Sequence, residues 1–343
     1  MDNIELKHLI RLKLSQLDVF KSINEIQVAV RCPYCGDSVK NPNSAHFYIK
    51  LNIRNEDEPI LFNCFRCDMS GIVTPSVLRT LGISDLQLNS SLIAYNSKTV
   101  GKINKALGIT DNQFDFIVPM PDENDERNIR KKRYIEQRLG LEFTFKQLVE
   151  LKTVFSLGQF LKANDIDKIT TKREKAILLN NDYVGFLTTR NEFINFRNIY
   201  PNENKRYEKY SIFNNLDNTR KFYTIPNEID LLTTKKITIN IAEGVFDILG
   251  IYFHLYEQER KNMIYTAVCG SGFVSVLKYF IKMGVIDNVD INIYSDDNRY
   301  PKFYAPMVKE LKPWVNEFTL FYNEKDKDYG VPKDGIKIVR KKI

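Results

Sequence analysis

The sequence predicts an α/β protein in three successive parts, and three observations indicate it. Two Cys-x2-Cys pairs near the N-terminus flank a stretch of alternating apolar and polar residues, which is typical of a small antiparallel β-sheet. Near the C-terminus, apolar strands alternate with helical stretches, as in a doubly wound, mostly parallel sheet. Residues 127–221 between them are basic, with 20 Lys and Arg against 11 Asp and Glu. We therefore expect a cysteine-bearing domain at 1–84, a linker at 85–128, a basic α+β core at 129–235 and a doubly wound domain at 236–343.

Composition excludes several classes of protein. No apolar run reaches the length needed to cross a bilayer, and residues 1–18 lack the pattern of a signal peptide, so we expect a soluble intracellular protein without a membrane partner. Four of the five cysteines are paired in spacing, which in a reducing compartment favours a metal over disulfides. The fifth, Cys269, precedes a glycine turn and is expected to be a small buried residue.

The N-terminal part is expected to open with a helical segment over residues 4–30 and to continue as strands. Residues 46–54 (HFYIKLNIR) alternate between apolar and polar, and residues 59–67 (PILFNCFRC) supply the returning strand. Tyr48 and Lys50 fall on the polar face, where they could stack on bases and contact phosphates of single-stranded nucleic acid. An ordinary polar face of a small sheet explains these two residues equally well.

The four paired cysteines predict a zinc site. A Cys-x2-Cys knuckle places two thiolates on one edge of a tetrahedral ion, and a second knuckle closes the shell. Four filled positions leave no place for a reactive water, so we predict one structural Zn²⁺. The predicted ligands are Cys32, Cys35, Cys64 and Cys67.

The central and C-terminal parts differ in pattern. A helix is expected over residues 129–139, followed by mixed helices and strands to about residue 234. Beyond that, four apolar runs predict strands, with helices between them, one of them around residues 305–312. These runs are ITINIA (237–242), MIYTAVCG (263–270), VDINIYS (289–295) and EFTLFYN (317–323).

Acidic residues follow the ends of these strands. Glu243 ends the first strand, Gly244 permits a turn, and Asp247 comes one helical turn later. Carboxylates at the carboxyl ends of parallel strands lie where open α/β sheets bind ligands, and several of them suit Mg²⁺ or Mn²⁺. Two such ions can activate a hydroxyl and stabilise a leaving pyrophosphate. Glu243 alone could equally be an acidic residue at a helix N-terminus. The later strands are followed by Asp296, Asp297 and Asn298, and then by Asp326, Asp328 and Asp334.

Three motifs, taken in their order along the chain, resemble the TOPRIM domain of DnaG-type primases and of type IA and type II topoisomerases. These motifs are EGVFD, CGSG and YSDDN. With CPYCGDS…CFRC in front, the chain is similar as a whole to phage DNA primases. YIEQRLGL (134–141) looks like the helix that opens the primase polymerase core. YVGFLTTRNEFINFRN (183–198) looks like the strand pair that ends in that family's template-binding arginine, and NKRYEKYS (204–211) looks like the basic stretch that follows.

The resemblance implies roles for the acidic residues. Glu243 would be the general base or a metal ligand, and Asp296 a Mg²⁺ ligand. The third acid would sit in a Lys-Asp pair after the next strand, which Asp328 fits best, with Asp334 as the alternative. The family usually has Asp-x-Asp where this chain has SDDN. Either Asp296 leads and Asn298 takes the second place, or Ser295 replaces the first aspartate and Asp297 is the second. We favour the former, because only Ser295 separates Asp296 from the strand.

The resemblance also implies a groove for nucleic acid beside the metals. It would be lined by Arg197, Lys205, Arg206 and Lys209, which could pin the template backbone or grip a nucleoside triphosphate. The competing interpretations are a solvated loop for Lys205 and Arg206 and a structural salt bridge for Arg197.

By this resemblance the chain is expected to be a Mg²⁺-dependent DNA primase, which makes short RNA primers for phage DNA replication by metal-assisted nucleotidyl transfer. Its implied partners are single-stranded DNA, ribonucleoside triphosphates and a replicative helicase of the DnaB-like type, in the cytoplasm of the bacterial host. An alternative is a non-catalytic recombination mediator of the RecR type, which also joins a four-cysteine zinc module to a TOPRIM domain. The basic region between the two modules argues against it.

Overall fold

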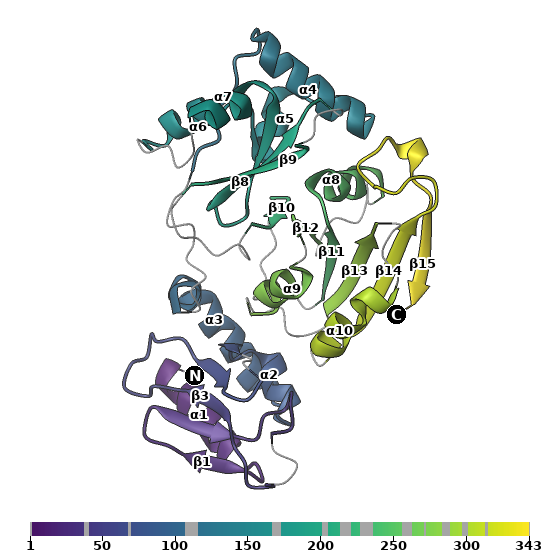
Figure 1. Ribbon diagram of the computed structural model, residues 1–343. Coiled ribbons are helices and arrows are strands. Elements are labelled where there is room, and N and C mark those ends of the chain that lie inside the picture. Colours follow the sequence, from purple (N-terminus) through teal and green to yellow (C-terminus); the bar gives the residue numbers. More distant parts are fainter. Residues whose placement is uncertain are drawn as a thin grey trace.

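The N-terminal part is an antiparallel sheet covered by helices (Figure 1). The computed structural model describes residues 2–37, 41–67, 70–106, 116–166, 173–200, 205–212, 221–226, 236–255, 263–270, 272–282, 289–296, 301–312 and 315–342. Helix α1 (Asn3–Ser15) begins at the N-cap Asp2, which forms a capping box with Glu5. The strands pair in chain order: β1 (Phe20–Ser22), β2 (Gln27–Val30), β3 (Phe47–Lys50), β4 (Leu61–Cys64) and β5 (Ser70–Ile72).

The two strands expected in this part are confirmed as β3 and β4. The helical expectation for residues 4–30 is wrong beyond Ser15, because β1 and β2 form a hairpin there. The Asn24 side chain explains the turn, since its Oδ1 accepts hydrogen bonds from the backbone amides of Ile26 and Gln27. Asparagine at that place favours a turn over a continued helix.

The segment expected to be a linker, residues 85–128, contains a helix of 21 residues, α3 (Leu86–Ala106). Leu88, Leu92 and Tyr95 repeat at helical spacing and are buried. They belong to the same hydrophobic cluster as residues of α1 and of α2 (Pro75–Thr80). The first half of this segment therefore packs as part of the N-terminal region. Residues 107–115 lie outside the described residues.

Among its described residues, the central part combines four helices with a second antiparallel sheet, of strand order β6-β7-β8-β9. The expected helix is confirmed as α4 (Glu126–Leu139), which begins earlier than expected because Asp125 caps it. The other helices are α5 (Phe145–Glu150), α6 (Leu157–Ala163) and α7 (Arg173–Asn181). The strands are β6 (Thr153–Val154), β7 (Tyr183–Leu187), β8 (Phe193–Asn198) and β9 (Tyr207–Ser211).

The C-terminal part is a six-stranded mixed sheet of order β10-β12-β11-β13-β14-β15, which confirms the doubly wound, mostly parallel expectation. The four inner strands are parallel, and β10 and β15 run antiparallel at the edges. The strands are β10 (Tyr223–Thr224), β11 (Ile237–Ala242), β12 (Met263–Ala267), β13 (Val289–Ser295), β14 (Glu317–Asn323) and β15 (Ile338–Lys342). The helices are α8 (Val245–His254), α9 (Phe273–Lys282), α10 (Pro301–Leu311) and the short η3 (Lys333–Gly335).

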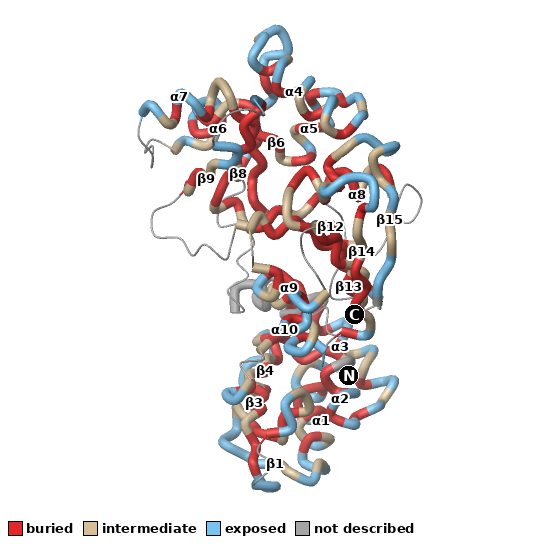
Figure 2. The backbone as a smooth tube through the Cα atoms, turned by 45° about the vertical axis from the view of Figure 1, so that its right-hand side comes forward, coloured by how far each residue is buried: buried red, intermediate tan, exposed pale blue. Residues whose placement is uncertain are grey.

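Helices cover both faces of this sheet, as a doubly wound fold requires. Ile239 and Ile241 of β11 lie in the hydrophobic cluster of α9 and α10, whereas Ala242 lies in the cluster of α8 and α4. Because strand residues alternate between faces, the sheet buries both sides. In Figure 2 the inner strands β12, β13 and β14 are largely buried, while the outer turns of α4 and α7 are exposed. Among the described helices, none has both the length and the apolar character needed to span a bilayer.

Candidate functional site

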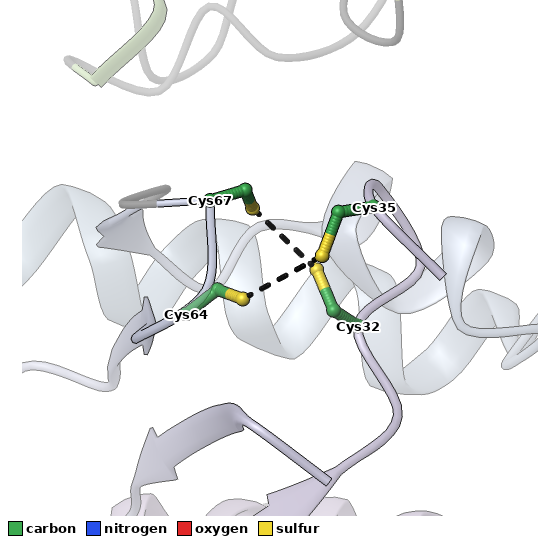
Figure 3. A group of neighbouring side chains, drawn as sticks. All are labelled: Cys32, Cys35, Cys64 and Cys67. Atoms are coloured by element: carbon green, nitrogen blue, oxygen red, sulfur yellow. Dashed lines mark hydrogen bonds between the residues drawn. The ribbon is translucent and has the colours of Figure 1, made fainter. Parts of the chain in front are cut away.

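The four paired cysteines converge at the tip of the N-terminal sheet (Figure 3). Cys64 ends β4, Cys67 follows it, and Cys32 and Cys35 come after β2. Their sulfur atoms all lie within 4.8 Å of one another, and the Cys32–Cys67 and Cys35–Cys64 pairs are each 3.9 Å apart. A tetrahedral ion with Zn–S bonds of about 2.3 Å would separate its sulfurs by roughly 3.8 Å. The four cysteines are therefore positioned for one metal ion and fit zinc.

A buried carboxylate supports the first knuckle. Asp37 Oδ2 accepts hydrogen bonds from the backbone amides of Cys32 (2.7 Å) and His46 (3.2 Å), and Oδ1 lies 2.6 Å from His46 Nδ1. Asp37 adopts a left-handed backbone conformation (φ 54°), which aspartate tolerates better than most residues. The sequence pattern did not mark either residue, because their contacts with the knuckle depend on the folded loop.

A cavity of about 590 Å³ lies between the carboxyl ends of the C-terminal strands and strands β8 and β9. Its acidic lining comprises Glu208, which pairs with Lys175 and Lys205, and four predicted site residues, Glu243, Asp247, Asp296 and Asp328. Glu243 follows β11, Asp296 follows β13, and Asp328 lies in the loop after β14. Its cationic lining is Arg138, Arg197, Arg206, Lys209, Lys221 and Lys327. The fold therefore gathers carboxylates and cations around one cavity.

The carboxylates share the cavity without forming a closed ligand cluster. Within the described ranges, the four cysteines are the only group of three or more His, Cys, Asp or Glu side chains gathered closely enough for one ion. Glu243 and Asp296 are half-buried at their strand ends. An open set of carboxylates suits Mg²⁺, which commonly keeps waters and binds substrate phosphates beside one or two protein ligands. Asp297 and Asn298 lie outside the described residues, so the register of this motif stays a prediction.

Asp247 binds backbone amides with both of its oxygen atoms. Oδ1 accepts hydrogen bonds from Tyr329 N (3.0 Å) and Gly330 N (3.2 Å), and Oδ2 accepts one from Gly244 N (3.1 Å). Burial raises the pKa of Asp247 to about 6, and the nearby charges of Asp296 and Asp328 add to this shift. Asp247 therefore ties the start of α8 to the loop that carries Asp328.

Arg138 of α4, which was not among the predicted site residues, also contacts the loop that carries Asp328. Its NH2 lies 3.7 Å from Asp328 Oδ2, its Nε donates to the Gly330 carbonyl (3.1 Å), and its guanidinium lies 4.9 Å from the Phe246 ring centre. The only sequence signal for Arg138 is its place within YIEQRLGL. Asp334, the alternative third acid, is exposed in η3 and does not line the cavity.

The basic wall comes mainly from β8 and β9. Arg197 is 9% exposed, donates from Nε to Tyr134 Oη (3.1 Å) and lies over the Tyr207 ring at 4.4 Å. Arg206 and Lys209 line the cavity, and burial lowers the pKa of Lys209, with Lys221 adding repulsion. Lys205 lies outside the lining and pairs with Glu208 at 3.5 Å. Three of the four predicted basic residues are thus brought together.

The two predicted nucleic-acid contacts of the N-terminal sheet lie outside this cavity. Tyr48 and Lys50 are half-buried on β3. Lys50 forms an ion pair with Glu58, and the Tyr48 ring packs edge-on against Phe65, with ring centres 5.0 Å apart. If these side chains contact nucleic acid, they do so at a second place on the molecule.

No family model matches this sequence, and no curated protein matches it. Among solved structures, the crystal structure of the Aquifex aeolicus primase (zinc binding and RNA polymerase domains) is similar, with a TM-score of 0.36 and 14% sequence identity. The similarity covers 96% of this chain and 81% of that one.

Proposed function

We propose that this chain is a DNA primase, a Mg²⁺-dependent nucleotidyltransferase that joins ribonucleotides into short RNA primers on single-stranded DNA. The observation that carries the proposal is the cavity in which Glu243, Asp296 and Asp328 lie opposite Arg197, Arg206 and Lys209. Nucleotidyl transfer needs this combination, because divalent ions and cations must together neutralise a triphosphate while the reacting groups are positioned.

The carboxylates would bind metal ions, and the cations would bind phosphates. Asp296 and Asp328 would hold Mg²⁺ or Mn²⁺, and Glu243 would bind an ion or take the proton of the attacking 3′-hydroxyl. A bound ion supplies charge neutralisation at the attacking oxygen and at the leaving pyrophosphate. Arg197, Arg206 and Lys209 would bind phosphates of the template or of the incoming nucleotide. Asp247 and Arg138 would keep Asp328 in place, since both hold its loop.

The proposal also assigns a role to each region of the chain. The C-terminal sheet, over residues 236–343, would be the TOPRIM catalytic domain, and residues 129–235 the basic half of the polymerase core. The zinc module, over residues 1–84, would bind the template through Tyr48 and Lys50. Phage replication in the bacterial cytoplasm, beside a DnaB-like helicase, is the setting in which we propose that it acts.

The test is primer synthesis by the full-length chain on single-stranded DNA with Mg²⁺ and labelled ribonucleotides. The wild type should make short RNA products, and Glu243→Gln should abolish them while binding of the DNA remains measurable. A wild type that binds DNA but makes no RNA would favour the non-catalytic mediator. A Glu243→Gln variant that still makes primers would overturn the assignment of Glu243.

A further inference from the structure

Tyr207 is an exposed aromatic residue at the wall of the cavity. It begins β9, it is 69% exposed, and it lines the cavity together with Glu243, Asp296 and Asp328. Tyr210, three residues further along the same strand, is 1% exposed and belongs to the core. Core packing therefore explains the aromatic character of Tyr210 but not that of Tyr207.

One face of the Tyr207 ring is backed by a fixed cation. Arg197 and Tyr207 are paired residues across β8 and β9, so their side chains stand on the same face of the sheet. The Arg197 guanidinium lies 4.4 Å from the ring centre and is itself held by Tyr134 Oη. A stacked guanidinium restricts the ring without covering its other face, and most of the residue remains open to solvent.

The surroundings of this ring fit a nucleotide. Arg206, Lys209 and Lys221 line the same cavity and offer charge to phosphates. An open aromatic face beside cations is the arrangement that binds a base and its phosphate together, since every base has a π-face that stacks on an aromatic ring.

We infer that Tyr207 is a stacking platform for a nucleobase in the cavity, with Arg197 as the residue that positions its ring. This inference deepens the proposed function, because it names the part of the cavity that holds a base rather than a phosphate. The base could come from the template strand or from the incoming ribonucleotide, and the chemistry of stacking is the same for both.

The test compares Tyr207→Ala and Tyr207→Phe with the matched control Tyr200→Ala, which alters a tyrosine that is 41% exposed and outside the cavity lining. Three ligands are titrated in the presence of Mg²⁺: a fluorescein-labelled single-stranded oligothymidylate, ATP, and inorganic triphosphate, which has no base. Tyr207→Ala should weaken binding of the oligonucleotide, of ATP or of both by about 5-fold to 150-fold. Tyr207→Phe and Tyr200→Ala should stay close to the wild type, and inorganic triphosphate should bind all variants alike.

The pattern of losses identifies the base. A loss confined to the oligonucleotide assigns the platform to the template, and a loss confined to ATP assigns it to the incoming nucleotide. Unchanged binding of both ligands by Tyr207→Ala overturns the inference. An equal loss for inorganic triphosphate also overturns it, because the effect would then act through the cations.

These titrations do not depend on primer synthesis, so the two proposals can fail separately. A wild type that makes no RNA but loses base-dependent binding on Tyr207→Ala contradicts the primase proposal alone. A wild type that makes RNA, with Tyr207→Ala binding all three ligands normally, contradicts the stacking inference alone.

Discussion

The cysteine cluster and the acidic cavity are both built from side chains that suit metal ions, but they are assembled in opposite ways. The cysteine sulfurs are already within 4.8 Å of one another, and they come from two knuckles at the ends of β2 and β4. The predicted metal-binding carboxylates come from three segments between Glu243 and Asp328 and remain spread along the cavity. A complete shell suits an ion that stabilises the fold, whereas an open set leaves room for a substrate to complete the coordination.

Charge repulsion helps to explain the difference. Carboxylates that share a cavity repel one another. Burial is the main reason that the pKa of Asp247 is raised to about 6, and repulsion by the charges of Asp296 and Asp328 is the second. The cavity counters its negative wall with Arg138 and with the cations of β8 and β9. The comparison therefore predicts that changes at the cysteines act on folding, and that changes in the cavity act on catalysis.

The largest effect is expected at the cysteines. Cys64→Ser should prevent zinc binding and unfold the N-terminal module, because a structural zinc site contributes on the order of 10 kcal/mol of binding free energy to the fold. Zinc content by elemental analysis and limited proteolysis of residues 1–84 would measure this. The matched control is Cys269→Ser, which lies at the cavity and should leave zinc content unchanged. A Cys64→Ser protein with one full equivalent of zinc would contradict the predicted ligand set.

The second prediction decides between the two candidates for the third acid. Asp328→Asn should lower the rate of primer synthesis on the order of 100-fold, since Asp328 lines the cavity and an amide is a poorer Mg²⁺ ligand. Asp334→Asn should change the rate by less than about twofold, because Asp334 is exposed outside it. Steady-state rates at several Mg²⁺ concentrations provide the measurement. The reverse ranking would identify Asp334 as the ligand.

A glycine in α8 tests whether the position of the Asp328 loop matters. A Cβ added at Gly250 would lie 2.0 Å from the Tyr329 carbonyl oxygen, so Gly250→Ala must displace that loop. Primer synthesis should fall about 10-fold to 100-fold while zinc content stays at one equivalent, since small displacements of catalytic groups are costly. Gly158→Ala in α6 is the matched control, because its nearest neighbour would be 3.7 Å away. Full activity in Gly250→Ala would show that the loop tolerates displacement.

The residues of the cysteine cluster and of the acidic cavity could largely be predicted from the sequence, because the motifs that mark them are short stretches of the chain. Apolar runs predicted β11, β13 and β14; Glu243 and Asp296 follow β11 and β13 directly, and Asp328 lies in the loop after β14. The paired spacing predicted the cysteine cluster for the same reason.

What the pattern did not reveal are contacts between distant segments. Arg138 reaches the Gly330 carbonyl across 192 positions, and Asp247 reaches the amides of Tyr329 and Gly330 across 82 and 83. Helix α3 was missed because its apolar positions lie among Asn and Ser residues, which favour loops, and it becomes a helix by packing on α1 and α2. Strands β1 and β10 are only three and two residues long, too short for a periodic signal.

The smallest predicted effect concerns a buried charge that belongs to neither site. Lys131 in α4 is fully buried, and its Nζ donates to the carbonyls of Phe155 and Asn180. Burial, together with the positive charge of Arg127, lowers its pKa from 10.5 to about 7. Between pH 7 and 10 the unfolded chain therefore keeps a proton that the folded protein has released, so the free energy of unfolding should rise with pH in that range.

The rise from this one lysine is limited to about 1.4 kcal/mol per pH unit. Lys131→Met should lack it, so the wild type should gain stability over the variant as the pH rises from 7 to 9 in urea unfolding. Below pH 7 both states of the wild type hold the proton, and the difference from Lys131→Met should become constant. A difference that is the same at pH 7 and pH 9 would mean that Lys131 stays charged in the fold. Zinc content should not change in either case, because Lys131 anchors α4 and touches neither the cysteines nor the cavity lining.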